Sequence, residues 1–321
     1  MTDTLVSQLG WIGLGNMGSA MASNLQNHLH SQSQPPLKFW NRTTSKGKTL
    51  TKIGGIKCDS ITDIVRDSTI IFISINNDEV LQDMITQIIS VGDLTDKIIV
   101  DTTTVHPDTS KEVSGQLARE NAFLVSGPVF GSAQMAAERK ILMVAAGPEC
   151  AIHRISPYIK GVIARDMIEV AQQPEKAALL KIIGRNFLVS GLTELIGEAQ
   201  VFAEKSNLGC EVVEKLLEAQ FGPLPVMISK RLTQGVYIPP KDTSPWSNLD
   251  LALKDTGHAI DCAAAVETRL PVGEVILDHL QRAKVYSKEQ DRQLDSAASY
   301  GIIRQDAGLE FENDFVKNRD S

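Results

Sequence analysis

The chain has 321 residues, of which 42% are hydrophobic and 22% are charged, a balance typical of a globular protein and not of a disordered one. The net charge of −7 and a pI near 5.5 disfavour nucleic acid and anionic membrane surfaces as partners. No apolar run of about 18 residues is present, so a membrane-spanning class is not expected.

The cysteines and the start of the chain bear on where the protein works. Cys58, Cys150, Cys210 and Cys262 lack the close spacing of a disulfide framework or a zinc site, so we expect reduced thiols and no metal. The first five residues lack the basic start and apolar core of a secretory signal. These features together predict a cytoplasmic protein.

The first half of the chain alternates short apolar runs, rich in β-branched and aromatic residues, with segments of helical length. Strands are predicted at residues 9–12, 37–40, 69–75, 98–100, 122–125, 142–145 and 167–170. Helices are predicted between them, for example at 17–29 and 79–89, and a polar loop at 31–36 precedes the second strand. Strands that alternate with helices form βαβ units, so we expect a Rossmann-type doubly wound parallel sheet, an α/β fold.

After residue 173 the strand-like runs end and the pattern becomes helical. Helices are predicted at residues 176–208, 210–220, 224–234, 249–268 and 273–285. We therefore expect an α/β domain at residues 1–173 and an all-α domain at residues 174–321. The charged segment from about residue 306 onward is expected to be a loose tail.

A glycine-rich turn joins the first predicted strand to the first predicted helix. It reads Gly13-Leu14-Gly15-Asn16-Met17-Gly18 and matches the pattern G-x-G-x-x-G. Gly13 permits the tight turn, Gly15 lets the backbone approach a pyrophosphate, and Gly18 lets helix and strand pack closely. Because the helix start also offers unpaired N–H groups to an anion, the turn indicates dinucleotide binding. A tight glycine turn without a ligand is the alternative.

The end of the second predicted strand bears on which dinucleotide is bound. NAD sites usually carry an acidic residue here, which accepts a hydrogen bond from the ribose 2′-hydroxyl, and this chain has none. Asn41, Arg42, Thr43 and Lys46 supply donors and positive charge instead, which suits a 2′-phosphate. We therefore expect NADP(H) as the cofactor, with a solvated loop arginine as the alternative for Arg42.

Together these residues resemble the β-hydroxyacid dehydrogenase family, which includes 3-hydroxyisobutyrate dehydrogenases, semialdehyde reductases and imine reductases and shares the NADP-binding domain of 6-phosphogluconate dehydrogenase. The resemblance covers most of the chain. Besides the glycine turn and Asn41-Arg42-Thr43, it rests on residues 101–107 and 128–131, the Lys181–Asn186 region and Lys254-Asp255. It implies hydride transfer between a nicotinamide and a small carbonyl or hydroxy compound, and a homodimer formed through the helical domain.

The resemblance also implies further cofactor contacts. Ile75, Asn76 and Asn77 would contact the adenine-ribose side of the cofactor, and Thr103 would lie near the nicotinamide ribose. Lys254 matches a lysine that lies beside the cofactor in the family. A surface lysine on a helix is the alternative there.

The expected substrate-binding motif departs from the family. Phe130-Gly131-Ser132 stands where many members have Ser-Gly-Gly, which binds a substrate carboxylate through its hydroxyl and N–H groups. Phe130 removes one donor and adds an aromatic wall, and Ser126 replaces the usual aspartate. We therefore expect a substrate that is larger or less polar than a simple β-hydroxyacid.

The family's proton donor is a lysine, and an asparagine four residues later holds the substrate or the lysine. Here Lys181 and Asn186 are five residues apart, which on an ideal α-helix leaves their side chains roughly 140° apart. Three explanations remain open. A π-bulge near Gly184 restores the pair; Lys181 is displaced and another donor acts; or the chain binds nucleotide without catalysis.

The leading hypothesis is an NADP(H)-dependent dehydrogenase or reductase in which Lys181 donates the proton. An imine reductase is the second enzyme hypothesis, which Phe130 favours and Lys181 opposes. A catalytically impaired nucleotide-binding or scaffold protein is the third. His106, before Pro107, is expected to cap a helix or lie on the surface and not to act in catalysis.

Overall fold

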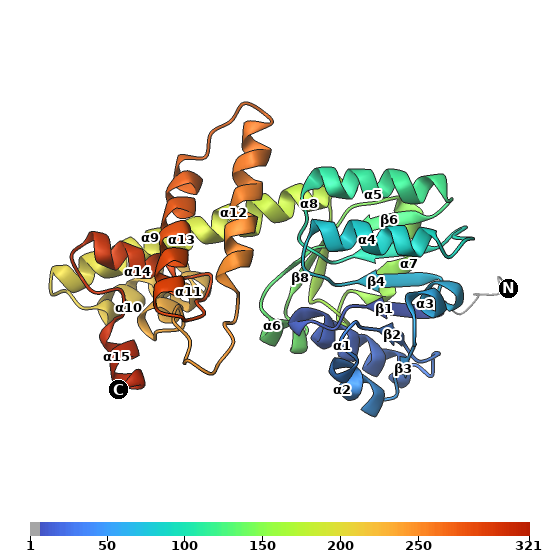
Figure 1. The fold of residues 1–321 in the computed structure, drawn as a ribbon, viewed down its shortest axis with the longest axis horizontal. Coiled ribbons are helices and arrows are strands. Elements are labelled where there is room, and N and C mark those ends of the chain that lie inside the picture. The colour runs from blue at the N-terminus through green and yellow to red at the C-terminus, as the bar shows by residue number, and fades with distance from the viewer. Residues whose placement is uncertain (1–6) are drawn as a thin grey trace. The chain divides into compact units, whose positions relative to one another are not determined.

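The structure is a computed structural model that describes residues 7–321, so the prediction about a signal at residues 1–5 lies outside the described residues. The chain divides into two units, one ending at Lys181 and the other running from Ile182 to Ser321 (Figure 1). The division falls within a continuous helical stretch, beyond the position between residues 173 and 174 that the sequence predicts.

A six-stranded parallel sheet with the strand order β3-β2-β1-β4-β5-β6 organises the N-terminal unit. This is the dinucleotide-binding strand order, so the predicted Rossmann fold is confirmed. Its strands are β1 (Leu9–Ile12), β2 (Lys38–Trp40), β3 (Ile56–Lys57), β4 (Ile70–Ile73), β5 (Ile98–Asp101) and β6 (Phe123–Ser126). Only β3, a two-residue edge strand, was absent from the prediction for this sheet, because a run that short carries no periodicity.

Helices cover both faces of this sheet, as Figure 1 shows for α1 on one side and α4 and α5 on the other. Side chains that alternate along the strands enter two separate cores, and Trp11 in one of them stacks on Phe72 with ring centroids 5.3 Å apart. The crossover helices of the sheet are α1 (Asn16–Ser31), α2 (Lys48–Lys52), α3 (Ile61–Asp67), α4 (Asp78–Ile89) and α5 (Pro107–Arg119), with the short 3-10 helix η1 (Thr44–Gly47) before α2.

The last part of the N-terminal unit forms a second, smaller sheet instead of extending the first. The chain leaves β6 at Gly127 and Pro128, and proline has no N–H group with which to continue a ladder. The strands β7 (Val129–Phe130), β8 (Leu142–Ala145) and β9 (Asp166–Glu169) pair in that order, antiparallel and then parallel. The strands predicted at 142–145 and 167–170 therefore exist but belong to this second sheet.

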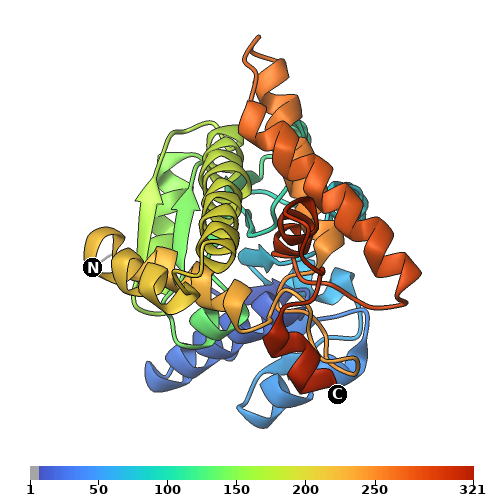
Figure 2. The ribbon, with the colours of Figure 1, turned by 90° about the vertical axis from the view of Figure 1, so that its left-hand side faces the viewer.

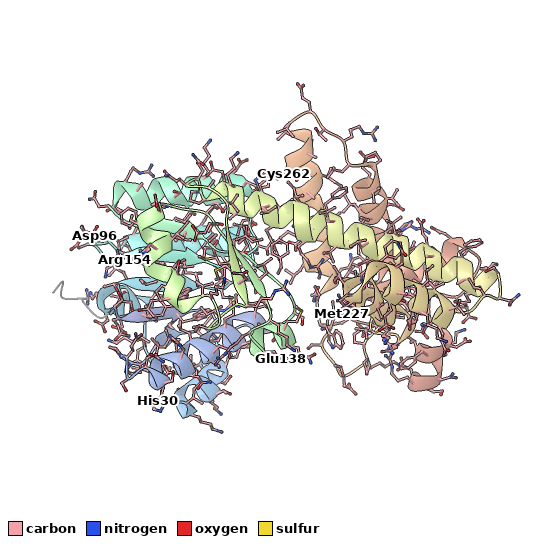
Figure 3. All side chains as sticks on the ribbon, turned by 180° about the vertical axis from the view of Figure 1, so that it is seen from behind. His30, Asp96, Glu138, Arg154, Met227 and Cys262 are labelled. Atoms are coloured by element: carbon pink, nitrogen blue, oxygen red, sulfur yellow. The ribbon has the colours of Figure 1, made fainter. Side chains whose placement is uncertain are left out.

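Helices α6 (Ala133–Ala137) and α7 (Glu149–Ile155), with the 3-10 helix η2 (Ser156–Tyr158), complete the N-terminal unit before α8 (Glu175–Lys181). Arg154 of α7 donates a hydrogen bond to the backbone carbonyl of Asp96 at 3.1 Å, and both residues are labelled in Figure 3. This contact ties α7 to the turn that leads into β5.

The second unit is all-helical, as predicted, and Figure 2 looks onto it. After the π-helix η3 (Ile182–Val189) come α9 (Ser190–Lys205), α10 (Cys210–Phe221), α11 (Pro223–Thr233), α12 (Leu249–Ala264), α13 (Pro271–Glu289), α14 (Ser299–Asp306) and α15 (Asp314–Asp320). Helices α12 and α13 pack side by side (Figures 1 and 2). No helix in residues 7–321 is long and apolar enough to cross a membrane.

The prediction of a loose tail after residue 306 is wrong. Phe311 is 3% exposed, its ring stacks on Tyr286 at 3.7 Å, and the hydroxyl of Tyr237 donates to its carbonyl at 2.8 Å. Val316 of α15 is fully buried. The sequence suggested a tail because charged residues dominate this segment. The structure shows that two buried apolar residues, Phe311 and Val316, are enough to hold it in place.

Candidate functional site: the nucleotide cradle and a buried lysine

The glycine-rich turn has the geometry that a dinucleotide needs. Gly13 has φ +96°, and a Cβ there would lie 2.2 Å from the carbonyl oxygen of Ser74, so only glycine fits. A Cβ on Gly18 would lie 2.3 Å from the carbonyl oxygen of Gly13, whereas one on Gly15 would meet nothing within 4 Å. Gly15 caps α1 without any side-chain hydrogen bond, so the first N–H groups of α1 remain available to an anion.

Asn41 ties this turn to the end of β2. Its Oδ1 accepts from the N–H of Leu14 at 2.7 Å, and its Nδ2 donates to the carbonyl of Thr43 at 2.8 Å. The side chains of Arg42 and Lys46 are exposed, and within residues 7–321 neither has an acidic partner at ion-pair distance. The structure thus brings the Asn41–Thr43 segment to the glycine turn and leaves two cations beside it.

A cavity of about 450 Å³ lies next to the glycine turn in the N-terminal unit. Residues of α1, of the η1–α2 segment and of α6 line it. Its lining consists of Leu14, Asn16, Ser19, Ala20, Ser23, Asn24, Lys46, Thr49, Leu50 and Ala137. Lys46 therefore shares a cavity with two residues of the predicted cofactor motif.

The loops that follow β4 and β5 are joined through Thr103. The N–H of Ile75 donates to the Thr103 hydroxyl oxygen at 3.3 Å, so two predicted cofactor loops meet there. Asn77 caps α4 by accepting from the N–H of Val80 at 3.0 Å, while Asn76 is exposed. His106 caps α5, its Nδ1 accepting from the N–H of Asp108 at 3.2 Å, which confirms the capping prediction.

Lys181 lies at the end of α8 with its side chain buried at 6% exposure. Its amine donates to the backbone carbonyl of Val129 at 2.5 Å and lies 4.6 Å from the centroid of the Phe130 ring. The structure therefore joins the predicted proton donor to the first residue of the predicted substrate motif. The rest of that motif turns sharply, since Gly131 has φ +138°, and Ser132 caps α6 by accepting from the N–H of Met135 at 3.3 Å.

The helix widens directly after Lys181. Residues 182–189 form the π-helix η3, so the π-bulge, one of the three explanations for the extra residue, is present and is longer than a single bulge at Gly184. Asn186, within it, is 2% exposed, and its Nδ2 donates to the carbonyl of Asp255 at 3.1 Å. Its Oδ1 is buried without a hydrogen-bond partner among the described residues.

Asp255 also forms an ion pair with the neighbouring Lys254, whose amine is 3.2 Å from the carboxylate. Asn186, Lys254 and Asp255 thus lie together on η3 and α12 of the helical unit. The other predicted cofactor residues, from Gly13 to Thr103, belong to the N-terminal unit.

Comparison with known proteins agrees with this geometry. Residues 8–170 match the family described as the NAD binding domain of 6-phosphogluconate dehydrogenase, which is half of the chain. The NADH-dependent oxidoreductase ucdB of Aspergillus ustus is 29% identical over 92% of this chain and 98% of its own length. The 3-sulfolactaldehyde reductase of Escherichia coli is 24% identical over 95% of this chain and 98% of its own.

Among solved structures, the 3-hydroxyisobutyrate dehydrogenase of Mycobacterium tuberculosis with L-serine is similar in fold. Its TM-score is 0.77 at 20% identity, with 94% of this chain and all of that chain covered.

The chain belongs to the β-hydroxyacid dehydrogenase family.

As a member of this family, the protein is an oxidoreductase with a domain that binds a nicotinamide dinucleotide. The assignment made from the sequence motifs is therefore confirmed at the level of the family. Within residues 7–321, no group of three or more His, Cys, Asp and Glu side chains is placed to hold a metal ion.

The sequence analysis gave no role to Asp101, although this residue begins the segment 101–107 on which the family resemblance partly rests. Asp101 ends β5 at 1% exposure, and its carboxylate accepts from the N–H of Thr103 at 3.0 Å. Burial raises the pKa of Asp101 to about 7, against the lowering effect of its hydrogen bonds with Thr103. The sequence does point to this residue, because an acid stands at the end of the otherwise apolar strand Ile98-Ile99-Val100-Asp101.

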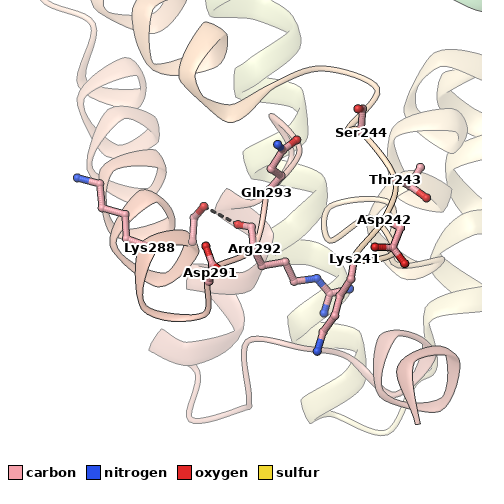
Figure 4. Close-up of a pocket in the computed structure, with 9 residues that line it drawn as sticks. Lys241, Asp242, Thr243, Ser244, Lys288, Asp291, Arg292 and Gln293 are labelled. Carbon is pink, nitrogen blue, oxygen red and sulfur yellow. Dashed lines mark hydrogen bonds between the residues drawn. The ribbon is translucent and has the colours of Figure 1, made fainter.

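Another cavity, of about 510 Å³, lies in the helical unit and is not a candidate for the reaction (Figure 4). Its lining holds none of the predicted site residues. The guanidinium of Arg292 in this cavity already donates to the carbonyl of Pro239 at 2.8 Å and pairs with Asp320, so its charge is neutralised within the protein.

Proposed function

We propose that the protein is an NADP(H)-dependent oxidoreductase that transfers hydride between the nicotinamide and a small carbonyl or hydroxy compound, with Lys181 as the proton donor. The observation that carries this proposal is the buried amine of Lys181, in a member of a dehydrogenase family, beside the Val129–Ser132 segment. A lysine is rarely buried at 6% exposure without a specific role.

The chemistry divides between the cofactor and the chain. The bound nicotinamide supplies or accepts the hydride. Lys181, as an ammonium, gives its proton to the carbonyl oxygen as negative charge develops on it, and the neutral amine takes the proton back in the reverse direction. The unpartnered Oδ1 of Asn186 accepts a hydrogen bond from the substrate hydroxyl or from the lysine.

The π-helix supports pairing Lys181 with Asn186. Hydrogen bonding from i to i+5 in place of i+4 reduces the turn per residue from about 100° to roughly 80°. Five residues then separate the two side-chain directions by about 40–50° instead of about 140°. This helical geometry supports the proposal that the one-residue offset from the family spacing is largely compensated.

The substrate class follows from Phe130. Its ring stands where many family members place a serine hydroxyl, and Ser126 at the start of the motif is buried at 1% exposure. We therefore propose a substrate whose non-reacting part is apolar, such as an aldehyde or ketone with an alkyl or aryl group. Cyclic imines share this character and are the second candidate class.

A spectrophotometric assay of NADPH oxidation tests the catalytic proposal against small aldehydes, 2-oxo acids and cyclic imines. Lys181→Ala should lower kcat by roughly two orders of magnitude or more. Lys176→Ala, an exposed lysine on the same helix, is the matched control and should leave the rate unchanged. An undiminished rate in Lys181→Ala would remove this lysine from the mechanism, and cofactor binding without any turnover would favour a scaffold role.

The cofactor preference is proposed from Arg42 and Lys46, which lack acidic partners in the described part of the chain and border the glycine turn. The Aspergillus relative is named for NADH, so the preference has to be measured. In fluorescence titrations NADPH should bind at least tenfold more tightly than NADH, since hydrogen bonds to charged groups contribute about 1.5–3 kcal/mol.

Arg42→Ala should weaken NADPH binding about tenfold or more and leave NADH binding unchanged. Lys52→Ala, an exposed lysine at the end of α2, is the control. Equal dissociation constants for the two cofactors in the wild-type protein would refute the NADP(H) preference.

A homodimer formed through the helical unit is part of the proposal. Helices α9, α10 and α11 pack on one another, and each carries large apolar side chains in solvent. These side chains are Leu195, Phe202, Val212, Leu216, Leu224 and Met227, of which Met227 is labelled in Figure 3. Exposed apolar side chains gathered on packed helices are typical of a protein–protein interface.

Light scattering tests the dimer. Phe202, at 74% exposure, should be part of the interface, so Phe202→Glu should shift the mass from dimer to monomer. Ile168→Glu, an exposed apolar residue of β9 in the other unit, should not. A monomeric wild-type protein at micromolar concentration would contradict this part of the proposal.

A further inference from the structure

Phe130 holds a fixed place against Lys181. Its ring is half-buried and packs, with Leu180, against the small cluster of Val144, Ala146 and Ala177. These contacts come from β8, the segment after it and α8, so the ring is held from two sides. The Lys181 amine lies 4.6 Å from the ring centroid.

Two opposing effects act on the protonation of Lys181. Burial disfavours the ammonium and favours the neutral amine. An aromatic face and a backbone carbonyl both favour the ammonium, and the Val129 carbonyl accepts from it at 2.5 Å. A proton donor must be charged before the reaction, so the ring acts in the direction that catalysis requires.

We propose that Phe130 is a positioning residue whose ring, together with the Val129 carbonyl, holds Lys181 as an ammonium ready to protonate the substrate oxygen. The inference rests on the proposed function of Lys181. It assigns to Phe130 a part that differs from the hydroxyl donor that many family members carry at this position.

The test measures the protonation of Lys181 directly and needs no substrate. The Cε resonance of Lys181, assigned from its absence in Lys181→Arg, is followed against pH by NMR in the full-length protein. Phe130→Leu removes the ring and keeps apolar volume, and it should lower the pKa of Lys181 by about 0.5–1.5 units. Phe130→Tyr keeps the ring face and should restore the wild-type titration.

Other charged groups near Lys181 are the same in every variant, so their effects cancel in the comparison. They are Asp108, Lys111, Glu112 and Arg119 on α5, which packs against α8, Glu175 and Lys176 on α8 itself, and Arg185 on η3, which directly follows α8. The strands β6 and β8 that also contact α8 carry no charged side chain.

An unchanged Lys181 titration in Phe130→Leu would overturn the inference and leave only a packing role for the ring. If Phe130→Leu does not fold, as judged by circular dichroism, Phe130→Met takes its place in the same comparison. In turnover, Phe130→Leu should move the alkaline limb of kcat downward in pH and leave the affinity for NADPH unchanged.

The two levels of the proposal fail separately. Full turnover in Lys181→Ala defeats the proposed catalytic role, whatever the titration shows. Loss of turnover in Lys181→Ala with identical titrations in Phe130→Leu and wild type defeats only the role of Phe130.

Discussion

Asp101 is a buried acid whose replacement should stabilise the protein at neutral pH. Its carboxylate is 1% exposed and accepts from the N–H of Thr103. Asp101→Asn keeps the shape and the accepting oxygen, and its new N–H group can donate to the Thr103 hydroxyl. The substitution therefore removes the charge and leaves the surroundings in place.

The magnitude follows from the pKa. Burial raises the pKa of Asp101 from 3.8 to about 7, so the folded protein holds this proton more tightly than the unfolded chain. The stabilisation from this tightly held proton is present in full below pH 3.8 and is lost as the pH rises toward 7. At 1.36 kcal/mol per pKa unit, the loss in the free energy of unfolding reaches about 4 kcal/mol. From pH 5 to pH 8, the free energy of unfolding of Asp101→Asn relative to the wild type should therefore rise by about 2–3 kcal/mol.

Urea unfolding followed by tryptophan fluorescence measures this advantage for the unit that contains Asp101. In a Trp246→Phe background, the remaining tryptophans are Trp11 and Trp40, both in the N-terminal unit. Trp246 is 67% exposed, so its replacement should cost little. The free energy of unfolding is compared between Asp101→Asn and its parent at several pH values from 5 to 8.

Asp93→Asn is the control, because a hydrogen bond from Thr95 lowers the pKa of this exposed carboxyl. From pH 5 to 8 the carboxyl of Asp93 is ionised in both the folded and the unfolded protein. The difference in the free energy of unfolding between this variant and its parent should therefore not change over that range. A flat difference for Asp101→Asn as well would refute the reasoning, since it would mean that Asp101 ionises alike in the folded and unfolded protein.

Two further predictions concern the glycine turn and the C-terminal segment. Gly13→Ala places a Cβ 2.2 Å from a carbonyl oxygen at φ +96°, so NADPH binding measured by titration should weaken at least tenfold; Gly92→Ala, at φ +110° but with open space around it, should bind normally. Phe311→Ala should lower the free energy of unfolding by about 3–5 kcal/mol in urea titrations, whereas Phe315→Ala, at 50% exposure, should lower it by less than 1 kcal/mol. Normal cofactor binding in Gly13→Ala, or equal losses in the two phenylalanine variants, would contradict these expectations.

Local sequence patterns predicted the parts of the site that depend on backbone geometry. The glycine turn between β1 and α1 and the cap at His106 each follow from a few neighbouring residues. A widened helix was one of three explanations for the five-residue spacing of Lys181 and Asn186, and η3 has that form. In each case the deciding interactions lie within about one helical turn or one tight turn.

Contacts between distant segments could not be predicted in this way. The amine of Lys181 meets Val129 and Phe130, which lie about fifty residues earlier in the chain. The segment around Phe311 is ordered by Tyr237 and Tyr286, and its own composition suggests a tail.

The sequence by itself determined the alternation of strands and helices in the Rossmann domain, the phosphate-binding turn after β1, and the family. These features could be predicted because the steric limits on glycine and the alternation of strand and helix act locally. Only the tertiary structure decided which polar groups are buried and what they face. Burial of Asp101, Lys181 and Asn186 depends on several elements packing together, and that burial sets the pKa of Asp101 and leaves the Oδ1 of Asn186 without a partner.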